Sequence, residues 1–286
     1  MTNAAYPPQS AVLEAVSRAI AEDLLPLGDL TSALLPSDLG ATASFVARGS
    51  GVLAGRACAV EAFRQIDPSI ELVWSVDDGD AITPGMVIAT AAGNLASILT
   101  AERTALNFLG HLSGIATLTR MFVDEAAKGG AARIWDTRKT TPGLRSLEKA
   151  AVRAGGGANH RGNLSDWILL KDNHIALFGI ADAVERARTM WPARTVHVEC
   201  DRLDQVREAL AANADALLLD NMTPDEIRAC VAIAADSQRR PLLEASGGIT
   251  LETVAAYSAA GVDCISIGGL TNSAPVLDIG LDIEPA

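Results

Sequence analysis

The sequence lacks the features of disulfide-rich, metal-thiolate and membrane-spanning proteins. Its 286 residues include four cysteines, Cys58, Cys200, Cys230 and Cys264, and none stands in a C-x-x-C or Cys/His metal-ligand spacing. No apolar run approaches the ~20 residues that a helix needs to cross a bilayer. The amino-terminal segment lacks a basic stretch followed by an apolar core, the pattern of a signal peptide. We therefore expect reduced, packed cysteines in a cytoplasmic protein.

Aromatic residues and positive charge are scarce as well. Phe, Trp and Tyr make up 4% of the chain, whereas hydrophobic residues make up 49% and there are 24 glycines. A composition rich in small aliphatic side chains suits helices packed on buried parallel strands and predicts an α/β fold. The net charge of −12 argues against nucleic acid or an anionic membrane as a partner.

Positive charge is nevertheless concentrated in one segment, residues 133–171. This segment carries eight basic and three acidic residues, a net charge of +5, whereas the remainder carries 15 basic and 32 acidic residues, a net charge of −17. A local cationic site in an anionic molecule focuses its field on a small anion. The segment therefore predicts a pocket for a highly anionic ligand.

The first hundred residues alternate between helical and strand-like patterns. Helices are expected at 10–24 and 56–66, and strands at 41–48, 71–76 and 86–93, which together predict a small α+β unit. A helical pattern then covers residues 94–127 and marks the domain junction. We expect Gly110 and Gly114 to interrupt that pattern and separate successive helices.

After the junction the rhythm becomes regular. Short apolar strands alternate with helical stretches, and the expected strands are RIW (133–135), WILL (167–170), TVHV (195–198), ALLL (216–219), PLLE (241–244) and CISI (264–267). Repeated β-then-α units predict a parallel sheet, which we expect to curve into an atypical, incomplete barrel because only six strands are clear.

The carboxyl-terminal tail alternates like a strand at 277–283 and is expected to return to the amino-terminal sheet. The predicted organisation is therefore an N-terminal α+β sandwich, residues 1–112 joined by strand 275–286, followed by an α/β barrel at 113–274.

A polar or glycine residue follows each expected barrel strand. The residues are Asp136, Arg138 and Lys139, then Lys171, Glu199, Asp220, Ser246 and Gly268. Any one of them reads as an ordinary solvated or capping residue. Because parallel strands end at the same edge, six such positions in register predict one shared site.

Two glycine-containing stretches suit phosphate. ASGGIT (245–250) follows a strand and is expected to open a helix, so Ser246, Gly247 and Gly248 would present backbone N–H groups to an anion. SIGGLTNS (266–273) repeats the pattern with Gly268 and Gly269. The alternative is that both glycine pairs are ordinary tight turns.

The basic side chains divide by chemistry. Arg138, His160 and Arg161 suit carboxylates, because a guanidinium fork matches a carboxylate at two points. Lys139 and Lys171 are compact charges suited to phosphate or pyrophosphate. For Arg145, Lys149 and Arg153, a solvated helix face at i, i+4 and i+8 is an equally good interpretation.

Glu199 and Asp220 end neighbouring strands and face this positive region. They could bind Mg²⁺, hold sugar hydroxyls or stabilise a developing cation, or they could be salt-bridge partners of Lys139 or Lys171. Among the histidines, His111 and His197 are expected to be structural, whereas His174 could be either structural or functional.

Taken together, these residues resemble the quinolinate phosphoribosyltransferase family, the decarboxylating nicotinate-nucleotide pyrophosphorylases of NAD biosynthesis. The resemblance runs from about residue 28 to residue 283. It is strongest in AERTALNFLGHLSGIAT (101–117), DTRKTTPGLR (136–145), GGGANHRGNLSD (155–166), LKDNH (170–174), LLDNM (218–222) and EASGGI (244–249). The sequence departs from the usual pattern at Ala150, Gly162 and Asn272.

The resemblance implies a pentosyltransferase that joins quinolinate to phosphoribosyl pyrophosphate and releases CO₂. It assigns the quinolinate carboxylates to Arg138, His160 and Arg161, with Arg103 contributed by the other subunit of a homodimer. It assigns pyrophosphate and carboxylate charges to Lys139 and Lys171. Glu199 and Asp220 would serve the ribosyl centre with Mg²⁺, and the 5′-phosphate would lie on Ser246, Gly247, Gly248, Gly268 and Gly269.

Three alternatives stay open on sequence alone. One is a related transferase-like protein associated with molybdenum transport. The others are a sugar-phosphate barrel enzyme, such as a lyase or isomerase, and a non-catalytic phospholigand sensor. The paired carboxylate binders favour a dicarboxylate over a sugar phosphate, and the strand-end acids favour chemistry over sensing.

Overall fold

The computed structural model describes residues 6–285, and it divides into two compact units. The first unit comprises the chain up to Arg120 together with residues 140–156 and the segment from Gly269 onward. The second comprises residues 121–139 and 157–268. Residues 1–5 and 286, which the expected domain ranges include, lie outside the described residues.

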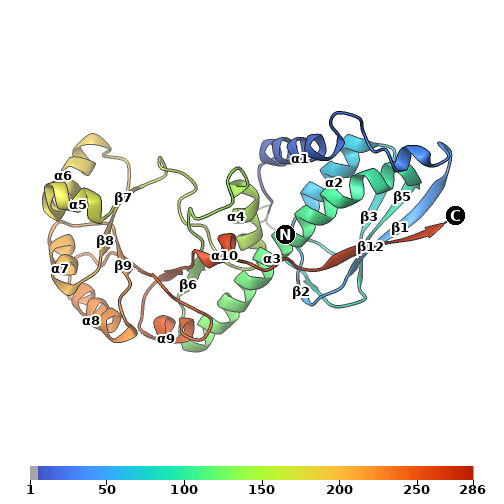
Figure 1. Ribbon diagram of the computed structural model, residues 1–286. Coiled ribbons are helices and arrows are strands. Elements are labelled where there is room, and N and C mark those ends of the chain that lie inside the picture. Colours follow the sequence, from blue (N-terminus) through green and yellow to red (C-terminus); the bar gives the residue numbers. More distant parts are fainter. Residues whose placement is uncertain (1–5, 286) are drawn as a thin grey trace. The chain divides into compact units, whose positions relative to one another are not determined.

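The first unit is an α+β sandwich built on a four-stranded antiparallel sheet in the order β12-β1-β5-β3. Its strands are β1 (Gly40–Ala47), β3 (Glu71–Trp74), β5 (Val87–Asn94) and β12 (Ile279–Pro285), which Figure 1 labels. The short strand β2 (Gly51–Val52) pairs with β4 (Ala81–Ile82). Its helices are α1 (Gln9–Leu24), α2 (Arg56–Ile66), most of α3 (Leu95–Gly129), α4 (Arg145–Ala154) and α10 (Gly269–Asn272), with a 3₁₀ turn at Ser32–Leu34.

The carboxyl-terminal strand completes this sheet. β12 pairs antiparallel with β1, from Ala41 opposite Pro285 to Ala47 opposite Ile279. Figure 1 shows the last strand running beside the first one, although the two are far apart in sequence. The predicted return of the tail to the amino-terminal sheet is therefore confirmed.

Helix α3 corrects one prediction. The helix is continuous for 35 residues, so Gly110 and Gly114 do not separate successive helices. Both glycines instead lie against the chain that leads into β12. A Cβ at Gly114 would lie 2.0 Å from the carbonyl oxygen of Pro275, and a Cβ at Gly110 would lie 2.8 Å from Val276. Close backbone packing, not a helix break, explains these glycines.

The second unit is the predicted incomplete barrel. Its six parallel strands follow the order β6-β11-β10-β9-β8-β7. They are β6 (Arg133–Trp135), β7 (Ile168–Leu170), β8 (Val196–Cys200), β9 (Ala216–Asp220), β10 (Leu242–Ser246) and β11 (Cys264–Ser266). Within residues 6–285, no strand ladder joins β6 to β7, so the barrel stays open there.

Helices cover the outside of these strands. They are α5 (Asp172–Phe178), α6 (Ile180–Met190), α7 (Leu203–Ala211), α8 (Pro224–Ala235) and α9 (Val254–Ala259). Figure 1 shows α6, α7 and α8 along the outer side of β7, β8 and β9. The strands are buried and aliphatic, as expected for parallel strands under helices. No helix within residues 6–285 is both long and apolar enough to cross a membrane.

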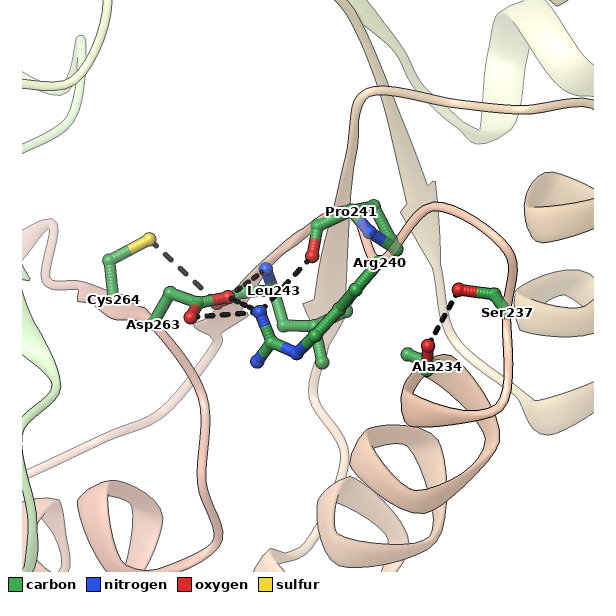
Figure 2. A network of polar contacts seen from close by, with 7 residues as sticks. All are labelled: Ala234, Ser237, Arg240, Pro241, Leu243, Asp263 and Cys264. Carbon is green, nitrogen blue, oxygen red and sulfur yellow. Dashed lines mark hydrogen bonds and ion pairs between the residues drawn. The ribbon is translucent and has the colours of Figure 1, made fainter.

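An ion pair fixes the amino ends of β10 and β11. Figure 2 shows the guanidinium of Arg240 against both carboxylate oxygens of Asp263, at 3.0 and 2.8 Å. The same carboxylate accepts a hydrogen bond from the backbone N–H of Leu243. The four cysteines, Cys264 beside this network included, are free and buried, so the prediction of reduced core thiols is confirmed.

Candidate active site

A cavity of about 550 Å³ opens at the carboxyl ends of the second unit's strands. It is lined by Thr137, Arg138, Lys139, His160, Arg161, Leu169, Lys171, Glu199, Leu218, Asp220, Asn221, Glu244, Ser246, Gly247, Gly248 and Ser266. Ten of these are residues that the sequence singled out for the site. Residues that lie more than a hundred positions apart in the chain therefore line one cavity.

A buried aspartate, Asp136, holds the loop that carries the carboxylate-binding candidates His160 and Arg161. Asp136, which is fully buried at the end of β6, accepts hydrogen bonds from Asn159 Nδ2 at 2.6 Å and from the backbone N–H of His160 at 2.9 Å. Asp136 thereby holds the loop that carries His160 and Arg161 against the strand that leads to Arg138. Its two hydrogen bonds fix the backbone of this loop.

Arg161 is held in a mostly buried position. It donates a hydrogen bond to the backbone oxygen of Trp167 at 3.2 Å, and 7% of the residue is exposed. Burial, and then the neighbouring Arg138 guanidinium, lower the pKa of Arg161 from its usual value. Two guanidinium groups that repel each other in a partly buried site favour the binding of an anion, and a dicarboxylate offers one carboxylate to each.

Acidic groups also line the cavity. Glu199 Oε2 lies 3.0 Å from Lys171 Nζ, so one of the salt bridges considered from the sequence is present. Burial raises the pKa of Asp220, while Lys171 and Lys139 act in the opposite direction. Asp220 also accepts a hydrogen bond from Asn221 Nδ2 at 2.7 Å.

The first glycine pair forms a tight turn over the end of β10. Gly247 and Gly248 both have left-handed φ angles, of 96° and 60°. A Cβ at Gly247 would lie 2.2 Å from Asn221 Oδ1, so only glycine fits there. The expected helix start is wrong, because α9 begins only at Val254. The turn itself can still present N–H groups to an anion.

The second glycine pair is placed differently. A Cβ at Gly268 would lie 2.9 Å from Lys139 Cδ, so the absence of a side chain at Gly268 leaves space for the side chain of Lys139. Gly269 begins α10, which belongs to the first unit. Neither glycine is among the described residues that line the cavity. Arg103 is also absent from that lining; it lies on α3 with its side chain 66% exposed.

The eight basic residues of the 133–171 segment do not form one pocket. Four of them line the cavity, namely Arg138, Lys139, Arg161 and Lys171. Arg133 lies at the amino end of β6. Arg145, Lys149 and Arg153 lie on α4 in the first unit, where Lys149 is buried and Arg145 donates to Thr140 Oγ1, so the three are not a simple solvated face.

Three of the four histidines have local structural contacts. His111 Nε2 lies 2.9 Å from Glu148 Oε1, and His174 Nδ1 accepts the backbone N–H of Lys171 at the start of α5. His197 stacks on Trp167, and burial lowers its pKa to about 4. These contacts are consistent with structural roles for His111 and His197, and His174 caps the start of α5.

Sequence reasoning missed two lining residues of chemical interest. Asn221 bridges Asp220 and the Gly247 turn, and Glu244 lies at the centre of β10. Asn221 could have been found because it directly follows a strand-end acid. Glu244 gave a weaker signal, since an acid inside an apolar strand is rare unless it is paired.

Comparisons with family models place both units in one family. The model described as "Quinolinate phosphoribosyl transferase, C-terminal domain" matches residues 115–282. The model described as "Quinolinate phosphoribosyl transferase, N-terminal domain" matches residues 29–113. The two matches cover most of the chain.

Full-length relatives agree with the family models. The chain is 44% identical to a probable nicotinate-nucleotide pyrophosphorylase (carboxylating) of Bacillus subtilis, over 90% of this chain and 88% of that one. It is 42% identical to the nicotinate-nucleotide pyrophosphorylase (carboxylating) of Mycobacterium leprae, over 96% of this chain and 97% of that one.

Solved structures show the same architecture. The nicotinate-nucleotide pyrophosphorylase of Francisella tularensis superposes with a TM-score of 0.94 at 38% identity, covering 99% of this chain and 100% of that one. The corresponding protein of Ehrlichia chaffeensis gives a TM-score of 0.90 at 39% identity, covering 95% of this chain and 98% of that one.

Proposed function

Because this chain belongs to the quinolinate phosphoribosyltransferase family, we propose that the cavity of its second unit is the site where quinolinate and phosphoribosyl pyrophosphate react. The reaction transfers the phosphoribosyl group to quinolinate with decarboxylation, giving nicotinate mononucleotide, CO₂ and pyrophosphate in NAD biosynthesis. The observation that carries the site assignment is the convergence of four cationic side chains and two strand-end acids on one cavity.

Quinolinate is assigned to the side of the cavity formed by Arg138, His160 and Arg161. Its two adjacent carboxylates match two guanidinium forks, and the buried position of Arg161 strengthens each charge-assisted hydrogen bond. Binding there leaves the pyridine nitrogen facing the rest of the cavity. That orientation is what attack on a ribosyl carbon requires.

Phosphoribosyl pyrophosphate is assigned to the other side. Ser246, Gly247 and Gly248 line the cavity and offer N–H groups to its 5′-phosphate. We propose that Gly268 and Gly269, which follow β11, add to this phosphate site. Lys139 and Lys171 neutralise the charge on the departing pyrophosphate. Their flexible ammonium groups can follow that charge as the bond to C1′ breaks.

Transfer proceeds by attack of the pyridine nitrogen on C1′ as the C1′–pyrophosphate bond breaks. The ribosyl centre then resembles an oxocarbenium ion, which Glu199 and Asp220 stabilise electrostatically. No general base is needed, because the attacking nitrogen carries no proton. The C2–carboxylate bond then breaks, CO₂ leaves, the electrons stay on C2 beside the cationic ring nitrogen, and C2 takes up a proton.

Mg²⁺ is proposed as the cofactor, with Glu199 and Asp220 as its protein ligands. Residues 6–285 contain no group of three or more His, Cys, Asp or Glu side chains arranged to hold a metal. Two carboxylates fit Mg²⁺, which is usually bound by one or two carboxylates together with substrate phosphates. When bound, the ion supplies charge neutralisation to the leaving pyrophosphate.

We further propose a homodimer in which Arg103 of one subunit completes the cavity of the other. Its support is an arginine that is two-thirds exposed on α3 in a unit that does not contain the cavity. A cytoplasmic location is also proposed, on the ground that four buried free thiols suit a reducing compartment.

The test of the site is product formation with matched substrates. Purified protein with quinolinate, phosphoribosyl pyrophosphate and Mg²⁺ is expected to yield nicotinate mononucleotide by chromatography. Nicotinate in place of quinolinate is expected to give none, since one carboxylate is missing. Omitting Mg²⁺ and adding a chelator is expected to abolish turnover, and full turnover under those conditions would overturn the cofactor assignment.

A further inference from the structure

Glu244 lies on the floor of the cavity and has no role in the chemistry above. It occupies the centre of β10, and its residue is 1% exposed. Alternation along the strand places Glu244 on the same face as Ser246, and both line the cavity. A buried carboxylate inside an apolar strand is costly unless a partner compensates its charge.

His160 faces this carboxylate. Glu244 Oε2 lies 3.4 Å from His160 Nε2, and both side chains are buried, at 1% and 7% exposure. The charge of Glu244 also reaches the neighbouring groups. Burial and then Arg138 lower the pKa of Arg161, and burial lowers the pKa of His197; Glu244 opposes the lowering at both.

The ring of His160 is fixed on its other sides. Trp167 lies 4.9 Å from it and Trp135 5.8 Å, measured between ring centroids. The backbone N–H of His160 is bound by Asp136. These contacts set the plane of the imidazole, whose Nε2 faces the carboxylate of Glu244.

We propose that Glu244 is a positioning residue for quinolinate binding, which acts through His160. The carboxylate of Glu244 faces Nε2 and fixes the direction in which the imidazole points, as a carboxylate behind a binding histidine does. The proposal rests on the assignment of His160 to a quinolinate carboxylate. The titratable and charged groups around His160 are Asp136 just after β6, Arg161 beside it, Arg138, His197 on β8 and Glu244 on β10.

A purely electrostatic role for Glu244 predicts a change in quinolinate affinity of the opposite sign. If Glu244 only offsets the excess of positive charge in the cavity, removing its charge should tighten binding of a dianion. If Glu244 holds His160 in the orientation that meets a quinolinate carboxylate, removing its charge should weaken binding, although the cavity then carries one negative charge fewer. The sign of the change in quinolinate affinity therefore separates the two roles.

The test measures quinolinate dissociation constants by calorimetry on the intact protein. Glu244→Gln is expected to weaken quinolinate roughly tenfold, with KM for phosphoribosyl pyrophosphate unchanged. Adding Glu244→Gln to His160→Asn is expected to cause no further loss, because the two act as one unit. Glu61→Gln is the matched control, since Glu61 is also a buried acid but pairs with Arg64 on α2; it should leave quinolinate affinity unchanged.

Tighter or unchanged binding in Glu244→Gln would overturn the proposal, as would an equal loss in the presence and absence of His160. If His160→Asn alone leaves quinolinate affinity intact, the carboxylate assignment of His160 fails, and this inference fails with it. If Glu244→Gln does not fold, Glu244→Asp replaces it, since the shorter side chain withdraws the charge from Nε2. It is then expected to weaken quinolinate only while His160 is present, and a loss without His160 would overturn the proposal.

Discussion

The ammonium nitrogen of Lys171 lies 3.0 Å from Oε2 of Glu199, at the ends of the neighbouring strands β7 and β8. The lysine side chain is 48% exposed and the glutamate 16%. A pair this open to water contributes about 1 kcal/mol or less to stability. Its value to the protein therefore lies in holding two charges of opposite sign at the mouth of the cavity.

We predict that replacing either member of this pair impairs catalysis far more than folding. Lys171→Met and Glu199→Gln are each expected to reduce kcat/KM by roughly 100-fold or more, with a thermal midpoint within a few degrees of the parent. Steady-state kinetics and thermal denaturation check both values. Arg240→Met is the matched control, because it breaks the Arg240–Asp263 pair at the opposite strand ends. A large fall in stability with normal kinetics would mean that the Lys171–Glu199 pair is structural.

The shared-site proposal predicts complementation between inactive variants. Arg103→Ala and His160→Ala homodimers are each expected to be nearly inactive. After mixing and subunit exchange, the heterodimer is expected to contain one cavity with both residues intact, so activity should return to about a quarter of the parent level. The measurement is activity against mixing time, with exchange followed by mass spectrometry of isotopically labelled subunits. Confirmed exchange without any return of activity contradicts the proposal.

Gly114 is predicted to be intolerant of any side chain. A Cβ there would lie 2.0 Å from the Pro275 carbonyl oxygen. In a helix, alanine is normally more stable than glycine by about 1 kcal/mol. Gly114→Ala is nevertheless expected to destabilise the protein by about 1–3 kcal/mol, because the backbone at Pro275 must move to make room for the methyl group. Urea denaturation gives the free energy of unfolding. Gly40→Ala serves as control, because the nearest atom to its Cβ would be 3.8 Å away. Equal free energies of unfolding for the two variants would contradict the prediction and show that the 275–277 segment can shift at little energetic cost.

The four thiols are predicted to be unreactive in the folded protein. Burial raises the pKa of Cys58 and Cys200 to about 12 and that of Cys230 to about 11, and it raises the pKa of Cys264 further. Because the thiolate is the reactive form, a disulfide reagent at about pH 8 should label none of the four in native protein. Denaturant should expose all of them to the reagent within minutes. Fast labelling of one thiol without denaturant would reveal local opening around it.

Local patterns were enough to locate most elements. Helix α2 and the six barrel strands were predicted within a residue or two, because their apolar periodicity ends at polar or glycine residues. The same reasoning failed for α3. A glycine in a helix signals either a break or a close approach, and only the position of the 275–277 segment decides between them.

The strand-end rule also grouped most of the residues that line the cavity. Parallel strands end at one edge, so Lys171, Glu199 and Asp220 could be grouped without knowing the fold in detail. Net charge along the chain was a poorer guide. It grouped Lys139 with Lys149, although Lys139 lines the cavity and Lys149 lies buried in the first unit.

The sequence by itself determined the fold class, the family and the chemistry of the side chains, because periodicity, residue type and motif spacing are properties of the chain. Only the tertiary structure decided which charges meet. Whether Lys171 faces Glu199, and whether Glu244 faces His160, depends on strand order and burial. Those distances set the strength of each electrostatic interaction, and residues far apart in sequence acquire them only when the strands assemble.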